Sequence, residues 1–264
     1  MRTIDINCDL GESFGNWRLG ADEEVLPHLT TASVACGFHA GDPVTMARTV
    51  ERAASLGVAV GAHPGLPDAL GFGRRRMEIS AEDAYTYVVY QVGALKAFLE
   101  PLGMPLNHVK PHGAFYGMLN ESPELAEAVV KAVIDTMPGK PVLYWPGGVE
   151  DKALVQAGRA AGVAVYQEYD PDLQYLSSGM HVVERHKAPL APERAAGLVR
   201  RFLVEGRIET RDGETIPLSA DSICVHGDGA TAAAVVRTIR DVLVECDVRP
   251  QPATGARATA GPPA

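Results

Sequence analysis

Residues 33–43, SVACGFHAGDP, mark the point at which a strand gives way to a helix. The run begins with small and β-branched residues typical of a strand, and two glycines then allow a tight change of direction. Asp42 followed by Pro43 is typical of a helix start, because the carboxylate accepts a backbone N–H at the N-cap and proline fits the first turn. We therefore expect His39 to lie on a tight strand-to-helix turn.

Strand-like and helical segments alternate along the rest of the chain. Residues 3–9, TIDINCD, place apolar and polar side chains in turn, and this period of two predicts a strand. Further strands are predicted at residues 31–36, 57–63, 107–112, 141–146, 163–168 and 222–228. Helices are predicted at residues 44–55, 81–99, 123–136, 150–160, 192–205 and 231–245. Repeated alternation of this kind is typical of a parallel sheet with helices between its strands.

Two segments depart from this alternation. Residues 207–218, RIETRDGETIPL, contain Asp212 followed by Gly213, a pair that predicts a small hairpin turn. Residues 248–264 are rich in Pro, Ala, Gly and Thr and show no apolar periodicity, so we expect a flexible and dispensable tail. The chain is therefore predicted to form a single domain over residues 1–247, followed by this tail.

Polar residues gather at the ends of the predicted strands rather than at their starts. They are Asn7, Asp9, His39, Asp42, His63, Lys110, His112, Glu168, His226 and Asp228. In a (β/α) barrel the strand ends meet at one face, where the active sites of that fold are built. An open doubly wound sheet binds ligands near its switch point and would scatter so many candidates. We therefore expect an α/β fold, a TIM-like (β/α) barrel of seven parallel strands.

Composition and charge exclude several classes of function. The 264 residues are 46% hydrophobic and 22% charged, enough for a large buried core. A formal net charge of -9 gives no basic surface for nucleic acid or an anionic membrane. The chain shows no charged and apolar leader, and no apolar run of the roughly 18 to 20 residues that cross a bilayer. We expect a cytoplasmic protein that binds neither nucleic acid nor membrane.

Several strand-end residues suit anion binding or proton transfer. Lys110 and His112 leave one predicted strand together, and a cation beside a titratable imidazole serves either task. His63, in GAHPG, either occupies a plain turn or contributes to a site. Arg74, in GFGRRR, either binds a phosphate or carboxylate group or is a solvated loop residue. His226 opens HGDG before a helix, which is a weak signal for phosphate binding.

Six ordered motifs make the chain recognisable. They are IDINCDLGES at 4–13, VACGFHAGDP at 34–43, GVAVGAHPGLPD at 57–68 with GFGRR at 71–75, YQVGALKA at 90–97, HVKPHGAFY at 108–116 and SICVHGDG at 222–229. Together they resemble the LamB/YcsF family over about residues 4–239. The resemblance implies a seven-stranded, TIM-like barrel related to the glycoside hydrolase and polysaccharide deacetylase superfamily.

The resemblance also implies a reaction and partners. Members of the family are identified with the A subunit of the ATP-dependent 5-oxoprolinase, which opens the lactam ring of 5-oxo-L-proline to L-glutamate with ATP hydrolysis. Partner subunits B and C, ATP and its accompanying Mg²⁺ are implied with it. From the chemistry of the strand ends we expect Asp9, His39, Lys110 and His112 to act in catalysis. We expect substrate or phosphate to be bound by Asn7, His63, Arg74, Glu168, Arg185, His226 and Asp228.

The chemistry assigns expected tasks to the catalytic residues. ATP phosphorylates the lactam carbonyl oxygen, which makes a stable amide a better target for water. We expect His39 or His112 to transfer protons. We expect Lys110 to balance phosphate charge, and Asp9 to orient an imidazole or to hold the magnesium ion that accompanies ATP.

One segment departs from the family pattern. Residues 167–189, QEYDPDLQYLSSGMHVVERHKAP, hold Leu173 where the family has an arginine, and the spacing from Gly179 to Arg185 is one residue longer. Loss of a guanidinium removes a bidentate partner for a carboxylate or phosphate. The substrate is therefore either 5-oxo-L-proline or another lactam or cyclic amide. In the latter case Arg185 or Lys187 takes the place of the missing arginine.

Two other classes of function stay open. A metal-dependent deacetylase or amidohydrolase would use Asp9, His39, His63 and His112 as ligands of a divalent ion. A non-catalytic ligand-binding barrel would keep the pocket after the altered loop had removed the chemistry. Stoichiometric zinc would favour the former, and tight lactam binding without turnover would favour the latter.

Overall fold

Seven parallel strands close into a barrel in the computed structural model, which describes residues 2–148, 152–182 and 189–253. The barrel strands are β1 (Arg2–Leu10), β2 (Thr31–Ala35), β3 (Ala59–His63), β4 (Leu106–Val109), β5 (Val142–Pro146), β6 (Ala164–Tyr169) and β9 (Ser222–His226). Each strand pairs in parallel with the next, and β9 pairs back to β1 with Cys224 opposite Asn7. The predicted fold class, a TIM-like barrel of seven parallel strands, is confirmed.

The polar side chains of β1 line the inside of the barrel. Asp5 accepts a hydrogen bond from Tyr144 of β5 at 3.1 Å, and Asn7 donates one to Glu168 of β6 at 2.6 Å. Neither β5 nor β6 is a neighbour of β1, so both bonds cross the interior. The period of two in residues 3–9 therefore separates this polar interior from the apolar layer under the helices.

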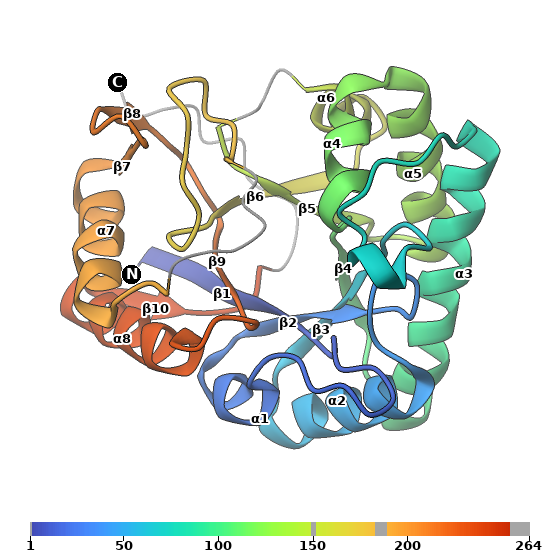
Figure 1. The fold of residues 1–264 in the computed structure, drawn as a ribbon, viewed down its shortest axis with the longest axis horizontal. Coiled ribbons are helices and arrows are strands. Elements are labelled where there is room, and N and C mark those ends of the chain that lie inside the picture. Colours follow the sequence, from blue (N-terminus) through green and yellow to red (C-terminus); the bar gives the residue numbers. More distant parts are fainter. Residues whose placement is uncertain (1, 149–151, 183–188, 254–264) are drawn as a thin grey trace.

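Helices surround the barrel on three sides in Figure 1. They are α1 (Asp22–Val25) and α2 (Pro43–Leu56) below, α3 (Ala81–Leu99), α4 (Gly113–Glu121), α5 (Pro123–Thr136) and α6 (Ala153–Ala160) on the right, and α7 (Pro192–Glu205) and α8 (Ala232–Glu245) on the left. Short 3₁₀ turns are η1 (Leu26–His28), η2 (Ala69–Gly71) and η3 (Glu100–Leu102). None of the helices in the described ranges is long and apolar enough to span a membrane.

Local sequence signals fix two of the helix starts. Asp42 accepts the backbone N–H of Thr45 at 2.8 Å and caps α2, so His39 lies in the turn between β2 and α2 as predicted. Ser80 caps α3, and Asp83 bonds back to the N–H of Ser80, which completes a capping box. These caps anchor the ends of the loops that carry the polar residues.

Three other elements show where the predictions hold and where they differ. The hairpin predicted within residues 207–218 is present as β7 (Arg207–Glu209) and β8 (Thr215–Pro217), which pair antiparallel. The helix predicted at 150–160 begins at Ala153, and residues 149–151 lie outside the described ranges. Helix α4 was not predicted, because His112 holds its N-cap position without a side-chain hydrogen bond.

The boundary predicted between domain and tail needs correction. Val248–Pro250 form β10, which pairs in parallel with the start of β1, Val248 opposite Arg2. The side chain of Val248 is buried, and the N–H of Gln251 donates to the carbonyl oxygen of Ile4 at 2.9 Å. Residues 248–250 therefore belong to the fold, because they pair with backbone groups at the start of β1. The sequence around residues 248–250 does not predict this pairing. Residues 254–264 lie outside the described ranges.

Two truncations test this boundary. Deletion of residues 248–264 is expected to lower the free energy of unfolding by about 2 kcal/mol, since it removes one buried aliphatic side chain and the pairing with β1. Deletion of residues 254–264 alone is expected to leave it unchanged. Urea unfolding of both truncated chains measures the difference, and equal stabilities would show that β10 contributes nothing.

Candidate active site

Side chains from four barrel strands meet around Lys110 at the C-terminal end of the barrel. The Lys110 ammonium lies 2.9 Å from Oδ1 of Asp9, 3.2 Å from Oε1 of Glu168 and 3.4 Å from Oδ1 of Asn7. Sγ of Cys224 lies 3.1 Å away on the remaining side. All five side chains are buried. Residues predicted separately at the ends of β1, β4 and β6 therefore form one charged cluster.

The charges in this cluster stabilise one another. Burial by itself lowers the pKa of Lys110, but nearby charges, that of Asp9 foremost, raise the net value well above its usual range. Burial raises the pKa of Asp9, but His63 and Lys110 hold the net value well below its usual range. Lys110 therefore stays an ammonium and Asp9 a carboxylate at neutral pH. Since its N–H donors are directed at cluster side chains, Lys110 fits a positioning role better than direct phosphate contact.

A hydrogen bond joins the rings of His63 and His112. Nδ1 of His63 lies 2.7 Å from the carbonyl oxygen of Lys110, and Nε2 of His112 lies 2.8 Å from that of Phe72, so both nitrogens are assigned as donors. The other two nitrogens, Nε2 of His63 and Nδ1 of His112, are 2.9 Å apart, a hydrogen bond that requires a proton between them. Oδ2 of Asp9 lies 3.3 Å from Nε2 of His63 and orients its ring.

His39 is a neutral imidazole that stacks on His112. It stacks on His112 with ring centroids 3.7 Å apart and planes 9° from parallel. Both ring nitrogens are buried, and neither has a hydrogen-bond partner among the described residues. Burial lowers the pKa of His39 well below its usual value, and the charges of His112 and His63 lower it further. A neutral ring nitrogen without a partner is suited to accept a proton.

Glu12 lies beside His39 and was not predicted as a site residue. Its Oε1 is 3.6 Å from Nε2 of His39, and its side chain is buried. Burial raises the pKa of Glu12 well above its usual value, and the charges of Asp9 and Asp228 raise it further. A carboxyl group held protonated can act as an acid. Its place in DLGES, directly after β1, was the available signal in the sequence.

Two glycines let the loop after β3 close over the histidines. A Cβ at Gly73 would lie 2.7 Å from Cβ of His39 and 2.9 Å from Cδ2 of His112, and the φ of Gly73 is +62°. A Cβ at Gly65 would lie 2.5 Å from Nδ1 of His39. The motifs GAHPG and GFGRR therefore enclose the imidazole rings.

Three predicted residues lie at the edge of the cluster. Nε2 of His226 is 3.8 Å from Oδ2 of Asp9, and its Nδ1 is 3.1 Å from Oδ2 of Asp172. Arg74 approaches Asp228 with 3.7 Å between NH2 and Oδ2, and both side chains are about one quarter exposed. These three side chains are partly exposed. Arg185 and Lys187 lie outside the described residues, so their predicted role stays a prediction.

Glu168 makes stability depend on pH. Burial raises its pKa from 4.5 to about 7, although Lys110 opposes the shift. Between these pH values the folded state holds a proton that the unfolded state has lost, so stability falls as pH rises and levels off above pH 7. At about 1.4 kcal/mol per pKa unit the loss is of the order of 3 kcal/mol.

The variant Glu168→Gln isolates this contribution. Urea unfolding across the same pH range is expected to show wild type losing stability relative to Glu168→Gln as pH rises. Other buried carboxyl groups titrate in both chains and cancel in the difference. Parallel curves for the two proteins would contradict the assignment to Glu168.

A model of the LamB/YcsF family matches residues 4–258. The chain belongs to the LamB/YcsF family. This match confirms the resemblance inferred from the six motifs, and it extends over the residues that form the cluster.

Related LamB/YcsF proteins cover nearly the same length. The 5-oxoprolinase A subunit of Brevibacillus brevis is 47% identical over 245 residues, which are 92% of this chain and 95% of the relative. That of Bacillus subtilis is 45% identical over 245 residues, 92% of this chain and 94% of the relative. The crystal structure of the lactam utilization protein from Thermus thermophilus is 39% identical, with a TM-score of 0.86 over 95% of this chain and 100% of that one.

The histidine cluster does not fit a resident metal ion. Glu12, His39, His63 and His112 offer ligand atoms within 4.8 Å of one another, a donor set of the zinc type. However, ring lone pairs lie in the ring planes, and His39 and His112 stack face to face, so they cannot both point at one ion. The predicted set, with Asp9 in place of Glu12, meets the same obstacle. Asp9 directs Oδ1 at Lys110 and Oδ2 at His63.

Proposed function

We propose that this chain is the lactam-opening subunit of an ATP-dependent 5-oxoprolinase, which converts 5-oxo-L-proline to L-glutamate. The observation that carries the proposal is a neutral His39 stacked against the proton-sharing His63–His112 pair at one end of the barrel. The relatives, each named as the A subunit of 5-oxoprolinase, support the same reaction. Because these names specify one subunit, they support a complex, and we infer that its other members are subunits B and C.

The reaction begins with activation of a stable amide. The lactam carbonyl oxygen attacks the γ-phosphorus of ATP, and ADP leaves. Water then adds to the activated ring carbon, the C–N bond breaks, and the products of this step are a free amine and an acyl phosphate. A second water hydrolyses the acyl phosphate to a carboxylate and inorganic phosphate. ATP is thus consumed to make the ring carbon electrophilic.

The cluster supplies an acid and a base for these steps. His39 takes a proton from the attacking water, because its ring is neutral and its nitrogens are free of partners among the described residues. The His63–His112 pair supplies the proton that the departing ring nitrogen needs, and Glu12 is a second donor beside it. Asp9 orients His63, so removal of this carboxylate would weaken the acid without touching the base.

In this proposal ATP binds at the C-terminal end of the barrel. Arg74 and His226 lie partly exposed there, and a guanidinium is suited to a phosphate group. The magnesium ion arrives with ATP as part of the substrate. We also infer a cytoplasmic location, since Cys8, Cys36, Cys224 and Cys246 are free thiols.

Reconstitution of the complex tests the proposal. Co-expression with subunits B and C is expected to give glutamate release from 5-oxoproline that requires both ATP and this chain. The variant His112→Ala is expected to abolish that release. ATP-independent lactam hydrolysis that a chelator stops would indicate a metal enzyme instead. Lactam binding without turnover under every combination of partner and nucleotide would indicate a non-catalytic barrel, and either result would overturn the proposal.

A further inference from the structure

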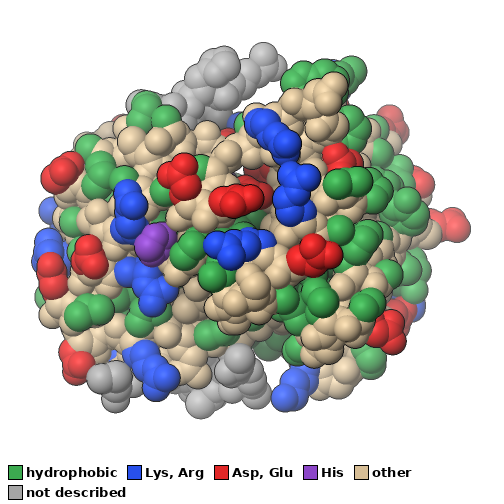
Figure 2. Space-filling model, turned by 90° about the horizontal axis from the view of Figure 1, so that it is seen from below, with side chains coloured by type: hydrophobic (Ala, Val, Ile, Leu, Met, Phe, Trp, Pro, Cys, Tyr) green, Lys and Arg blue, Asp and Glu red, His purple; other side chains and the backbone are tan. Residues whose placement is uncertain are grey.

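A pocket lies outside the barrel, between α1, α2 and the loop that follows β1. Its volume is about 310 Å³, within the range of small-molecule sites. Helices α1 and α2 form the face seen in Figure 2, on which acidic and basic side chains are interspersed. None of the residues assigned above to the active site lines this pocket.

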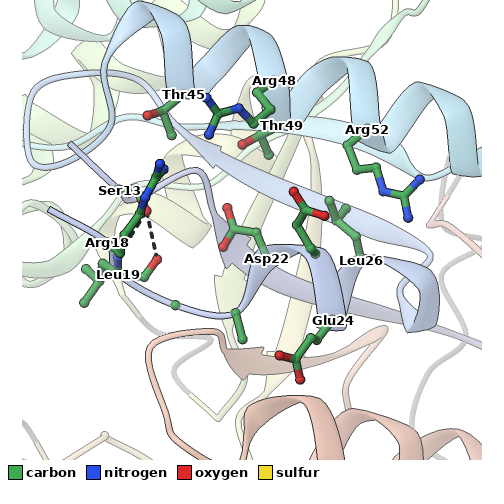
Figure 3. Close-up of a pocket in the computed structure, with 13 residues that line it drawn as sticks. Ser13, Arg18, Leu19, Asp22, Glu24, Leu26, Thr45, Arg48, Thr49 and Arg52 are labelled. Carbon is green, nitrogen blue, oxygen red and sulfur yellow. Dashed lines mark hydrogen bonds between the residues drawn. The ribbon is translucent and has the colours of Figure 1, made fainter. Parts of the chain in front are cut away.

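Two arginines form one end of the pocket. Arg18 and Arg48 point toward one another in Figure 3, with Thr45 and Ser13 close by. Arg52 lies at the other end of the same face of α2, four residues beyond Arg48. Within the described part of the chain, none of the three guanidiniums has an ion pair or a hydrogen bond. Two like charges that face each other across a concave surface favour an anionic group between them.

The acidic wall of the pocket determines which anion fits. The side chain of Asp22 points into the same space, and Glu23 and Glu24 also line the pocket. Three carboxylates therefore accompany the three guanidiniums, and a phosphate dianion would be repelled by this wall. A zwitterion instead meets each charge with its opposite. We propose that the pocket binds an α-amino acid, with its carboxylate between Arg18 and Arg48 and its ammonium group at Asp22.

The pocket shares its wall with the loop that carries Glu12. Oδ2 of Asp22 accepts the N–H of Gly11 at 2.8 Å, and Oγ of Ser13 accepts the N–H of Leu19 at 3.1 Å. Glu12 lies between Gly11 and Ser13, and these two hydrogen bonds hold the backbone on either side of it. A ligand that contacts Asp22 therefore acts on the backbone that positions Glu12 beside His39. The product of the proposed reaction is an α-amino acid, so the product would regulate the reaction by binding in this pocket. That regulation rests on the proposed function, whereas the binding of an α-amino acid to the pocket does not.

Calorimetric titration of L-glutamate into the isolated full chain tests the site without any turnover. Saturable binding is expected, with affinity at least tenfold lower in Arg18→Gln and in Arg48→Gln. Asp22→Asn, which keeps an acceptor for Gly11, is expected to weaken glutamate but not glutarate, which lacks the ammonium group. The control Arg200→Gln, on α7, is expected to bind as wild type does.

Three outcomes would overturn the proposal. One is the absence of saturable glutamate binding. Another is binding that His39→Ala abolishes and Arg48→Gln leaves intact, which would assign it to the barrel. The third is inorganic phosphate binding more tightly than glutamate and without dependence on Asp22. Failure of the proposed function would appear separately, as absent glutamate release from the complex with subunits B and C.

Discussion

If the proposed function holds, replacement of His39 by alanine is expected to lower kcat for ATP-dependent glutamate release about a thousandfold in the proposed complex with subunits B and C. The reason is that His39 is the neutral imidazole whose buried nitrogens have no partner among the described residues. No neighbouring ring can replace it, because His63 and His112 already share a proton. Initial rates of glutamate release at saturating 5-oxoproline and ATP measure the effect.

A second histidine provides the matched control. His28 ends η1, outside the barrel and away from the cluster, so His28→Ala is expected to keep wild-type kcat. Circular dichroism of both variants shows whether the fold persists. If folded His39→Ala retains more than a tenth of the wild-type kcat, His39 is not the base.

Replacement of Lys110 by methionine is expected to give the largest loss of stability, about 3–5 kcal/mol in the free energy of unfolding. The change removes the cation that lies 2.9 Å from Asp9 and 3.2 Å from Glu168, and it leaves buried carboxylates unbalanced. The loss is expected to shrink below pH 7, where Glu168 takes up a proton. Urea unfolding at several pH values measures both effects.

Two further variants show whether charge is the cause. The double variant Lys110→Met with Asp9→Asn is expected to recover part of the loss, because it removes one of the unbalanced charges. Lys131→Met makes the same substitution in the exposed pair with Asp135 and is expected to change stability little. Equal losses at Lys110 and Lys131, or no recovery in the double variant, would contradict a buried charge cluster.

Elements with local signals were predictable from the sequence, and elements that depend on distant partners were not. Helix α3 has the predicted bounds, Ala81–Leu99, because Ser80 and Asp83 form a capping box at its start. Strand β10 was missed because its partner is the start of β1, at the other end of the chain. Helix α4 was missed because no side chain caps it and glycines interrupt its pattern.

The same distinction applies to the active site. The barrel topology predicted that Asp9, Lys110 and Glu168 would meet, because each follows or ends a parallel strand. It did not predict which groups would be paired. The proton shared by His63 and His112 depends on carbonyl groups of the neighbouring loops, and the position of Glu12 depends on the conformation of a single loop. Side-chain spacing carries neither kind of information.

The pairing of β1 with β9 also constrains how the protein is made. Strand β1 is synthesised before its partner in the closed barrel, Ser222–His226, because β9 follows the other barrel strands along the chain. Until β9 is made, one edge of β1 has no strand partner, and the carboxylates that the closed barrel buries remain exposed to solvent. The barrel therefore cannot close strand by strand during synthesis, because closure waits for β9.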